Sequence, residues 1–75
     1  MIFVNNKTTK ILQLGKEIQK YRKSKGLSQN QFAELLDISR EHLAKIETAK
    51  RTVSLGLLID MANQLDIKVK DFFNF

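Results

Sequence analysis

The sequence predicts an all-α domain of five helices joined by short loops. Apolar residues recur at helical spacing in several segments, and a serine that can cap a helix precedes three of them. None of the 75 residues is a proline, and neither a low-complexity linker nor an internal repeat divides the chain. A chain of this length is expected to form one domain with a modest core.

The first helix is expected over about residues 11–25, because apolar residues follow the helical period there and Gly26 can end the helix in the left-handed conformation. The apolar positions are Leu14, Ile18 and Tyr21. Residues 1–10 show no such period. We expect them to form a loose tail or a short strand ahead of a domain over residues 11–75.

Serine residues mark where the next two helices begin. Ser28 precedes the second helix, and Gln31 can complete a capping box with it. Ser39 precedes the third helix, which is expected to end near Thr48. The inward face of the second helix is expected to consist of Phe32, Leu35 and Leu36.

Ser54 precedes a fourth helix with one apolar face. The residues expected on that face are Leu55, Leu58, Ile59, Ala62 and Leu65. A short fifth helix is expected over about residues 69–73, with Val69 and Phe72 turned toward the fourth.

Residues between Gln29 and Ile46 have the spacing of two short helices that cross through a tight turn. Ala33 is small enough for the helices to approach closely, and Asp37 lies at the corner, where a positive φ is expected. Leu43 and Ile46 turn one face of the third helix inward. The opposite face carries Arg40, Glu41 and Lys45. This arrangement is typical of a helix-turn-helix unit that presents a polar helix to a DNA groove.

The net charge of +5 is unevenly distributed along the chain. Residues 1–27 contain seven Lys or Arg and one acid, a charge of +6, whereas residues 28–75 contain six and seven, a charge of −1. A basic excess in so small a domain favours polyanions such as nucleic acids, through the release of counterions. The structural alternative is a solvated charged helix face. A membrane-surface helix is disfavoured because its apolar residues are needed in the core.

Other residue types limit the function classes. The chain has no cysteine, so it can form no disulfide and suits a reducing interior. No apolar run approaches the roughly 20 residues that span a bilayer, and the Ile2-Phe3-Val4 run lacks the flanks of a signal peptide. We therefore expect a cytoplasmic protein with no membrane partner. His42 is the single histidine, and without a nucleophile–base set or a glycine-rich phosphate loop the sequence indicates no metal, no cofactor and no enzyme.

Residues 14–73 resemble the Xre/phage-repressor (Cro-like) family of helix-turn-helix proteins. The order of several short motifs, more than any one of them, makes the resemblance specific. The motifs are Leu27-Ser28-Gln29, Phe32-Ala33, Leu36-Asp37-Ile38-Ser39-Arg40, Ile46-Glu47, Lys50-Arg51, Ser54-Leu55 and the segment from Leu65 to Phe73. The resemblance implies a compact five-helix, lambda-repressor-like DNA-binding domain whose helix-turn-helix is formed by the second and third helices.

The resemblance also implies roles for individual residues. Gln29, at the start of the second helix, would contact the DNA backbone or an adjacent base edge. The residues implied to read bases are Arg40, Glu41 and Lys45, with Ser39 and His42 beside them. Those implied to hold phosphate are Lys50, Arg51 and Thr52. Arg22 and Glu47 match a pair that forms an internal salt bridge.

Some of these roles have alternatives. Arg40 can donate two parallel hydrogen bonds to guanine, but it could also contact phosphate or remain a free surface charge. Glu41 could accept from cytosine, position Arg40 or pair with Lys45. The chain also departs from the family where Asp37 stands in place of the common glycine of the turn. After the third helix, Ala49 and Val53 replace the common glycine and proline.

Apolar residues expected to remain at the surface predict a homodimer interface around the fourth and fifth helices. They are Leu57, Met61, Phe73 and Phe75, with Ile2, Phe3 and Val4 as a further contribution. We therefore expect a sequence-specific transcriptional regulator, most simply a repressor that binds double-stranded DNA at a pseudo-palindromic operator as a homodimer. The alternative is an antitoxin or interaction module that binds a partner protein and uses DNA binding for autoregulation.

Overall fold

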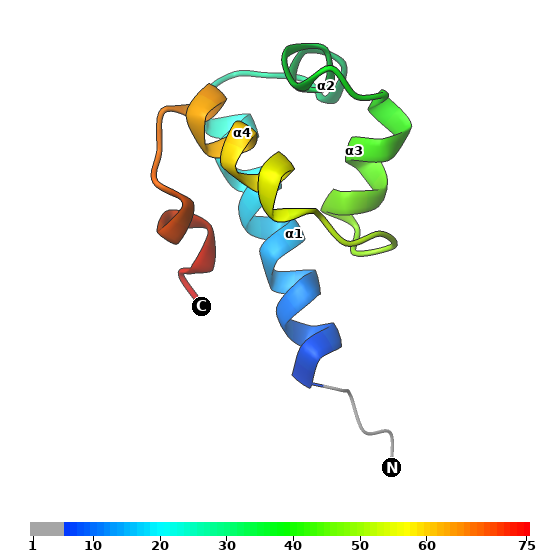
Figure 1. Ribbon diagram of the computed structural model, residues 1–75, viewed down its shortest axis with the longest axis vertical. Coiled ribbons are helices and arrows are strands. Elements are labelled where there is room, and N and C mark those ends of the chain that lie inside the picture. The colour runs from blue at the N-terminus through cyan, green and yellow to red at the C-terminus, as the bar shows by residue number, and fades with distance from the viewer. Residues whose placement is uncertain (1–5) are drawn as a thin grey trace.

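The computed structural model describes residues 6–75, which form four α-helices followed by a 3-10 helix (Figure 1). The elements are α1 (Asn6–Ser24), α2 (Gln29–Leu36), α3 (Arg40–Glu47), α4 (Leu55–Leu65) and η1 (Val69–Phe73). The predicted all-α fold is confirmed. The predicted fifth helix exists, but it is a single 3-10 segment, so the number of α-helices is four within the described residues.

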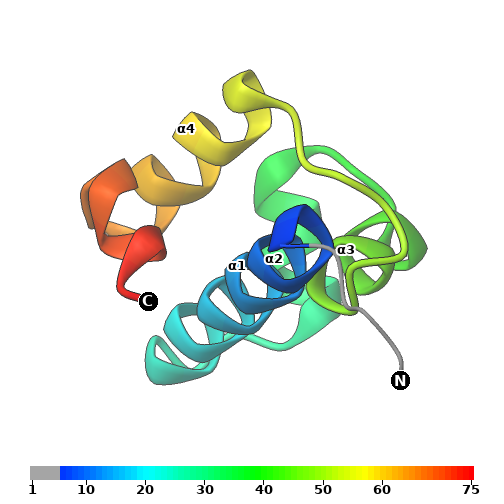
Figure 2. The same cartoon turned by 90° about the horizontal axis from the view of Figure 1, so that it is seen from below.

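The longest helix, α1, packs against α3 and η1, while α4 packs against α2 and η1. Figures 1 and 2 show α3 and α4 on opposite sides of the view, with η1 beside α4. Consecutive helices α2 and α3 pack against each other through a short turn, as the sequence predicts for a helix-turn-helix. Helix α3 also packs against α1, and within the described residues the side of α3 turned away from both helices is exposed.

The prediction of a tail or strand was wrong for residues 6–10, because α1 begins at Asn6. Extending an existing helix by a turn is favourable once the rest has formed, even where the added residues bury little surface. The Lys10 ammonium also lies 5.4 Å from the centre of the Phe75 ring, which ties this turn to the C-terminal segment. Residues 1–5 lie outside the part that the structure describes.

All four α-helices end with the same backbone motif. A residue in the left-handed conformation follows each helix, and the next residue donates its N–H to a carbonyl five positions back. The left-handed residues are Gly26, Asp37, Ala49 and Asp66. The positive φ predicted at Asp37 is confirmed at 57°.

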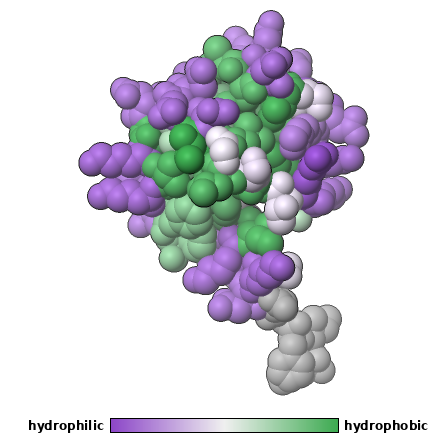
Figure 3. All heavy atoms as spheres, viewed as in Figure 1, coloured by the Kyte–Doolittle hydropathy of each residue, from purple (hydrophilic) through white to green (hydrophobic). Residues whose placement is uncertain are grey.

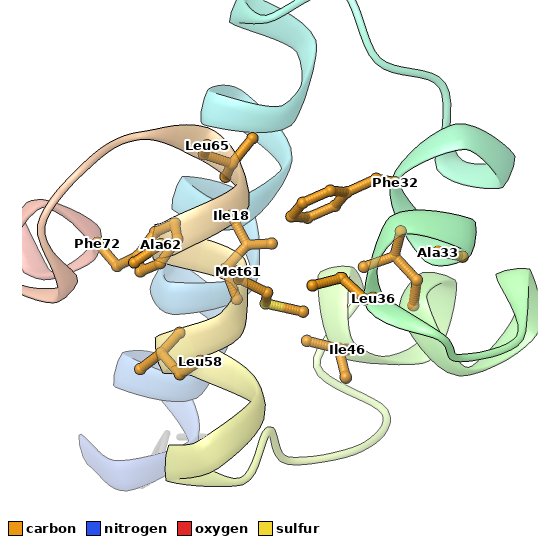
Figure 4. Close-up of a cluster of buried hydrophobic side chains, with 11 residues drawn as sticks. Ile18, Phe32, Ala33, Leu36, Ile46, Leu58, Met61, Ala62, Leu65 and Phe72 are labelled. Carbon is orange, nitrogen blue, oxygen red and sulfur yellow. The ribbon is translucent and has the colours of Figure 1, made fainter.

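Side chains from every element meet in one core. Its members are Ile18, Phe32, Ala33, Leu36, Leu43, Ile46, Leu58, Met61, Ala62, Leu65 and Phe72. Three residues predicted to face inward are exposed instead, namely Leu35, Leu55 and Ile59. On α2 the inward face is turned toward Ala33, where α3 approaches, and this rotates Leu35 outward. On α4 the inward stripe includes Met61, which Figure 4 shows turned toward Leu36 and Ile46.

A close contact between α1 and α3 has no counterpart in the predictions from sequence. A Cβ atom on Gly15 would lie 2.7 Å from the carbonyl oxygens of both Ile46 and Glu47. Only glycine lets the backbone of α1 come so near the end of α3. Gly15 therefore determines how closely α1 and the C-terminal end of α3 approach each other.

Candidate nucleic-acid interface

The helix α3 is anchored from behind and exposed in front. Leu43 and Ile46 are buried in the core, while Arg40, Glu41 and Lys45 are exposed on the opposite face. An eight-residue helix is marginal alone, so its conformation depends on this packing and on its cap. The outer face is thus a polar surface on a rigid support.

Side chains cap the start of both helices of the unit. Ser39 Oγ accepts a hydrogen bond from the His42 backbone N–H at 3.0 Å, so Ser39 begins α3 as expected. Ser28 and Gln31 form the predicted capping box at the start of α2. His42 itself is half-buried, next to the exposed residues of the outer face.

A buried carboxylate connects the two helices to α1. Arg22 donates to Glu47 twice, from Nε to Oε2 at 2.7 Å and from Nη2 to Oε1 at 3.1 Å. This is the ion pair that the resemblance implies, and both side chains are almost fully buried. Arg22 Nη1 also donates to the carbonyl of Leu27 at 2.8 Å, just before α2. The pair therefore joins the end of α1, the start of α2 and the end of α3.

Gln29 extends this network to the exposed face. Its Nε2 donates to Glu47 Oε1 at 3.0 Å, and its Oε1 accepts from Arg40 Nη1 at 3.2 Å. Because Glu47 can only accept, the orientation of the amide is fixed, and Gln29 must offer its oxygen to Arg40. Gln29 therefore orients the Arg40 side chain through this hydrogen bond. This link was not predicted, because it depends on how the helices cross and leaves no signal in residue spacing.

Two further predicted residues pair with each other. Lys45 Nζ lies 3.3 Å from Glu41 Oε1, one helical turn away, with both side chains largely exposed. Such a pair is weak in water and breaks readily when a stronger partner arrives. Glu41 therefore partly neutralises Lys45 in the free protein. The pairing with Lys45 is one of the alternatives expected for Glu41.

The loop after α3 folds back onto the end of that helix. Ala49 adopts φ = 61°, and the backbone N–H groups of Lys50 and Arg51 donate to the carbonyl of Lys45 at 2.8 and 3.2 Å. The expected glycine conformation is therefore kept by an alanine. Lys50, Arg51 and Thr52 are exposed, and Arg51 lines a shallow hollow together with Ser39, Glu41, His42 and Lys45. Seven of the nine residues predicted to contact DNA thus lie on α3 or the loop that follows it, Ser39 caps the start of α3, and Gln29 contacts Arg40.

The residues predicted for a dimer interface fall into different environments. The prediction was wrong for Met61, which is fully buried because it completes the inward stripe of α4. Leu57 is half-buried against the core. Phe73 and Phe75 are exposed, with ring centres 6.1 Å apart. Figure 3 shows apolar side chains gathered over α4 and the C-terminal segment, where Leu55 and Ile59 are also exposed.

Residues 6–75 form neither a metal site nor a membrane-spanning helix. No group of three or more His, Cys, Asp or Glu side chains is placed to hold a metal ion. None of the described helices combines the length and the apolar character that crossing a membrane requires.

A shifted pKa lies on α1, away from the outer face of α3. A hydrogen bond with Glu17 raises the pKa of Lys20 there.

Comparisons with known proteins give the same assignment. A family model described as helix-turn-helix, HTH_3, matches residues 18–72. An HTH-type transcriptional regulator of Rickettsia conorii is 40% identical over 60 residues, which cover 80% of this chain and 48% of that protein. The chain therefore spans about half the length of this curated relative.

Solved structures are similar over most of the fold. The restriction-modification controller protein C.AhdI from Aeromonas hydrophila superposes with a TM-score of 0.83 and 31% identity, covering 87% of this chain and 98% of that one. The biofilm regulator SinR, solved in complex with DNA, gives 0.75 and 31%, covering 81% and 98%. The chain belongs to the helix-turn-helix family of the Xre/Cro-like type, whose members similar to it include HTH-type transcriptional regulators and restriction-modification controller proteins.

Proposed function

We propose that this helix-turn-helix regulator binds a specific operator sequence through α3 and acts as a repressor by blocking access to a promoter. The observation that carries the proposal is the position of Arg40. It stands on the exposed face of a helix fixed from behind, and a hydrogen bond from its guanidinium to Gln29 Oε1 orients it. A guanidinium held in this way matches the O6 and N7 acceptors of guanine in the major groove.

In this proposal the other residues of the interface contact either bases or phosphates. Glu41 follows Arg40 directly and Lys45 lies one turn further along α3, and their weak pair can open so that each contacts a base or a phosphate. Lys50, Arg51 and Thr52 follow at the end of the helix, where phosphates border the groove. In this proposal Gln29 serves mainly to position Arg40, with Ser39 and His42 beside the backbone of the DNA. A cytoplasmic location gives the protein access to that DNA.

We further propose that two copies bind together on a pseudo-palindromic site. A single α3 contacts few base pairs, and two copies related by a two-fold axis would place their helices in major grooves about 34 Å apart. The exposed apolar residues of α4 and the C-terminal segment supply the surface for this contact.

In vitro selection of duplexes from a random pool tests the base-reading role. The parent is expected to enrich one sequence with two related halves. Arg40→Ala should lose preference at one position of each half, with a discrimination loss of about 1–3 kcal/mol at that position. Lys50→Ala is the matched control, because loss of a phosphate contact should weaken all duplexes alike and leave the selected sequence unchanged. An unchanged selected sequence with Arg40→Ala would refute the assignment.

The same apolar surface also supports a second candidate function, the binding of a partner protein as in an antitoxin. Phe73 is 49% exposed and Phe75 is 41% exposed, large fractions for phenylalanine. In this alternative a different protein covers the surface, and DNA binding serves autoregulation. Purification from the native cell distinguishes the two, because a second chain that co-elutes at equal stoichiometry would favour the partner protein.

A further inference from the structure

A hollow of about 190 Å³ lies between α1, the end of α3 and the loop that leads to α4. Its walls are aliphatic, with Ile11 and Ile18 from α1, Ile46 from α3 and Val53 from the loop. Arg51 and Thr52 are the polar side chains that line it. The volume exceeds the roughly 150 Å³ of an engineered apolar cavity that holds benzene.

The hollow has a rigid inner wall. Gly15 lines it, and the backbone of α1 at Gly15 rests directly on the carbonyls at the end of α3. Ile18 and Ile46 belong to the core, so the aliphatic wall behind the hollow is fixed by packing. A ligand that entered would therefore meet a preformed apolar surface, which lowers the entropic cost of binding.

The charge at the hollow is positive and unneutralised. Within the described part of the chain, the carboxylates that form ion pairs do so with Lys20, Arg22 and Lys45, and none pairs with Arg51. A guanidinium prefers a planar carboxylate, with which it can form two parallel hydrogen bonds. Aliphatic walls beside one free guanidinium and one hydroxyl are complementary to an anion with a small apolar body.

We propose that the hollow binds a small apolar monocarboxylate, such as an aryl or branched aliphatic acid, whose carboxylate pairs with Arg51. Arg51 also lines a second, separate hollow on the outer face of α3, beside Glu41 and Lys45. The ligand therefore competes with DNA phosphate for the same guanidinium. This second step rests on the proposed DNA-binding function, whereas binding of the acid does not. The acid would be an effector that releases the protein from DNA.

The first test is a titration of the free protein with benzoate, followed by ¹H–¹⁵N NMR. Saturable shifts are expected at the amides of Gly15 and Thr52, with a dissociation constant in the millimolar range. Benzyl alcohol, which keeps the ring, and acetate, which keeps the charge, should each bind about tenfold more weakly, since each lacks one part of the match. Shifts that do not saturate, that lie elsewhere, or that acetate reproduces would overturn the proposal.

A blocked variant checks the location. Ile11→Trp places an indole in the hollow while keeping Arg51, and should lower benzoate affinity by about tenfold or more. Equal affinity in this variant, with its helical circular dichroism unchanged, would overturn the site. If the variant does not fold, the shift pattern of the parent still decides.

The second test measures DNA affinity by fluorescence anisotropy over a series of salt concentrations, with the ionic strength matched at each point between samples with and without benzoate. Saturating benzoate should weaken DNA binding several-fold and reduce the log–log salt slope by about 0.9, one phosphate contact. Benzoate that binds the hollow without changing DNA affinity would refute competition through Arg51. A protein that binds benzoate but no duplex would instead count against the proposed DNA-binding function.

Discussion

Glu47 is the residue on which three helices converge. Its carboxylate accepts hydrogen bonds from Arg22 and Gln29, and all three groups are wholly or partly removed from water. A buried ion pair contributes little net stability compared with apolar residues, but removal of one partner leaves an uncompensated charge. The identity of Glu47 is therefore a strict requirement for the geometry of the interface.

Glu47→Ala should destabilise the protein by about 3–5 kcal/mol, because the Arg22 guanidinium would be buried without a partner. That is a large part of the roughly 5–15 kcal/mol that stabilises a small domain. Urea denaturation followed by circular dichroism measures the loss. Glu41→Ala is the control on the same helix, and its exposed pair with Lys45 should contribute at most about 1 kcal/mol. Equal denaturation midpoints for the two variants would contradict the prediction.

The sequence predicted the residues of this network better than their contacts. Arg22 and Glu47 followed from the family resemblance, and Arg40 from its place at the start of the recognition helix. The part played by Gln29 could not be predicted, because its side-chain amide bridges Arg40 and Glu47, which lie 11 and 18 positions further along the chain. Hydrogen bonds between residues 11 and 18 positions apart depend on the helix crossing itself.

At the scale of elements, the ends of the helices follow one rule with one exception. Gly26, Asp37 and Asp66 are residue types that enter the left-handed region readily, but Ala49 is not. The motif at the end of α3 nevertheless has the same hydrogen bonds as the others, with Lys50 N–H donating to Lys45 O at 2.8 Å. The loop that carries Lys50 to Thr52 is thus held in place at the cost of a strained backbone.

Ala49→Gly should stabilise the protein by roughly 0.5–1 kcal/mol, the left-handed penalty of alanine less the extra chain entropy of glycine. Thermal melting measures the change. Gly26→Ala is the reverse control, since φ there is 71° and no atom lies within 4 Å of the added Cβ. It should destabilise by a similar amount through the backbone alone. A lower melting temperature for Ala49→Gly would show that the loop carries no such strain.

Gly15 determines the contact between α1 and α3. Gly15→Ala should destabilise by about 1–3 kcal/mol, because the new Cβ would overlap two backbone carbonyl oxygens that cannot move aside independently. Gly56→Ala is the matched control on α4, where the added Cβ meets no atom within 4 Å, and it should stabilise by about 0.5 kcal/mol. Denaturant midpoints that move in the same direction would contradict this account.

The elements themselves were largely predictable, whereas their faces and limits were less so. Capping serines and left-handed residues located the ends of α2, α3 and α4, since these signals are local. The first turn and a half of α1 has no apolar period, and so its helical state could not be read from the sequence. Leu35 and Met61 were assigned to the wrong environment because the crossing of helices decides which side of a short stripe faces inward.

At the scale of the whole molecule, polar and apolar surfaces occupy different sides. The outer face of α3 and its following loop carry the residues proposed to hold DNA, while Leu55, Ile59, Phe73 and Phe75 lie on α4 and the C-terminal segment. Contact through the second surface would leave both copies of the first free. This separation is what a two-fold assembly on a palindromic site needs.

The apolar surface makes oligomeric state the decisive whole-molecule measurement. Sedimentation equilibrium at tens of micromolar protein should give a dimer for the parent, and Phe73→Glu should give a monomer because two buried carboxylates would face each other across the axis. Leu35→Glu is the matched control: Leu35 is 50% exposed, close to the 49% of Phe73, but lies on α2 away from the proposed contact. It should remain a dimer.

The same two variants connect assembly with DNA binding. Phe73→Glu should bind a full palindrome no more tightly than a single half-site, because the second binding event would no longer be intramolecular. Its affinity for the half-site should match that of the parent, since the outer face of α3 is unchanged. The dimer would be excluded if the parent sediments as a monomer and its affinities for the full palindrome and the half-site differ by less than about twofold. That result would favour a different protein as the partner of Phe73 and Phe75.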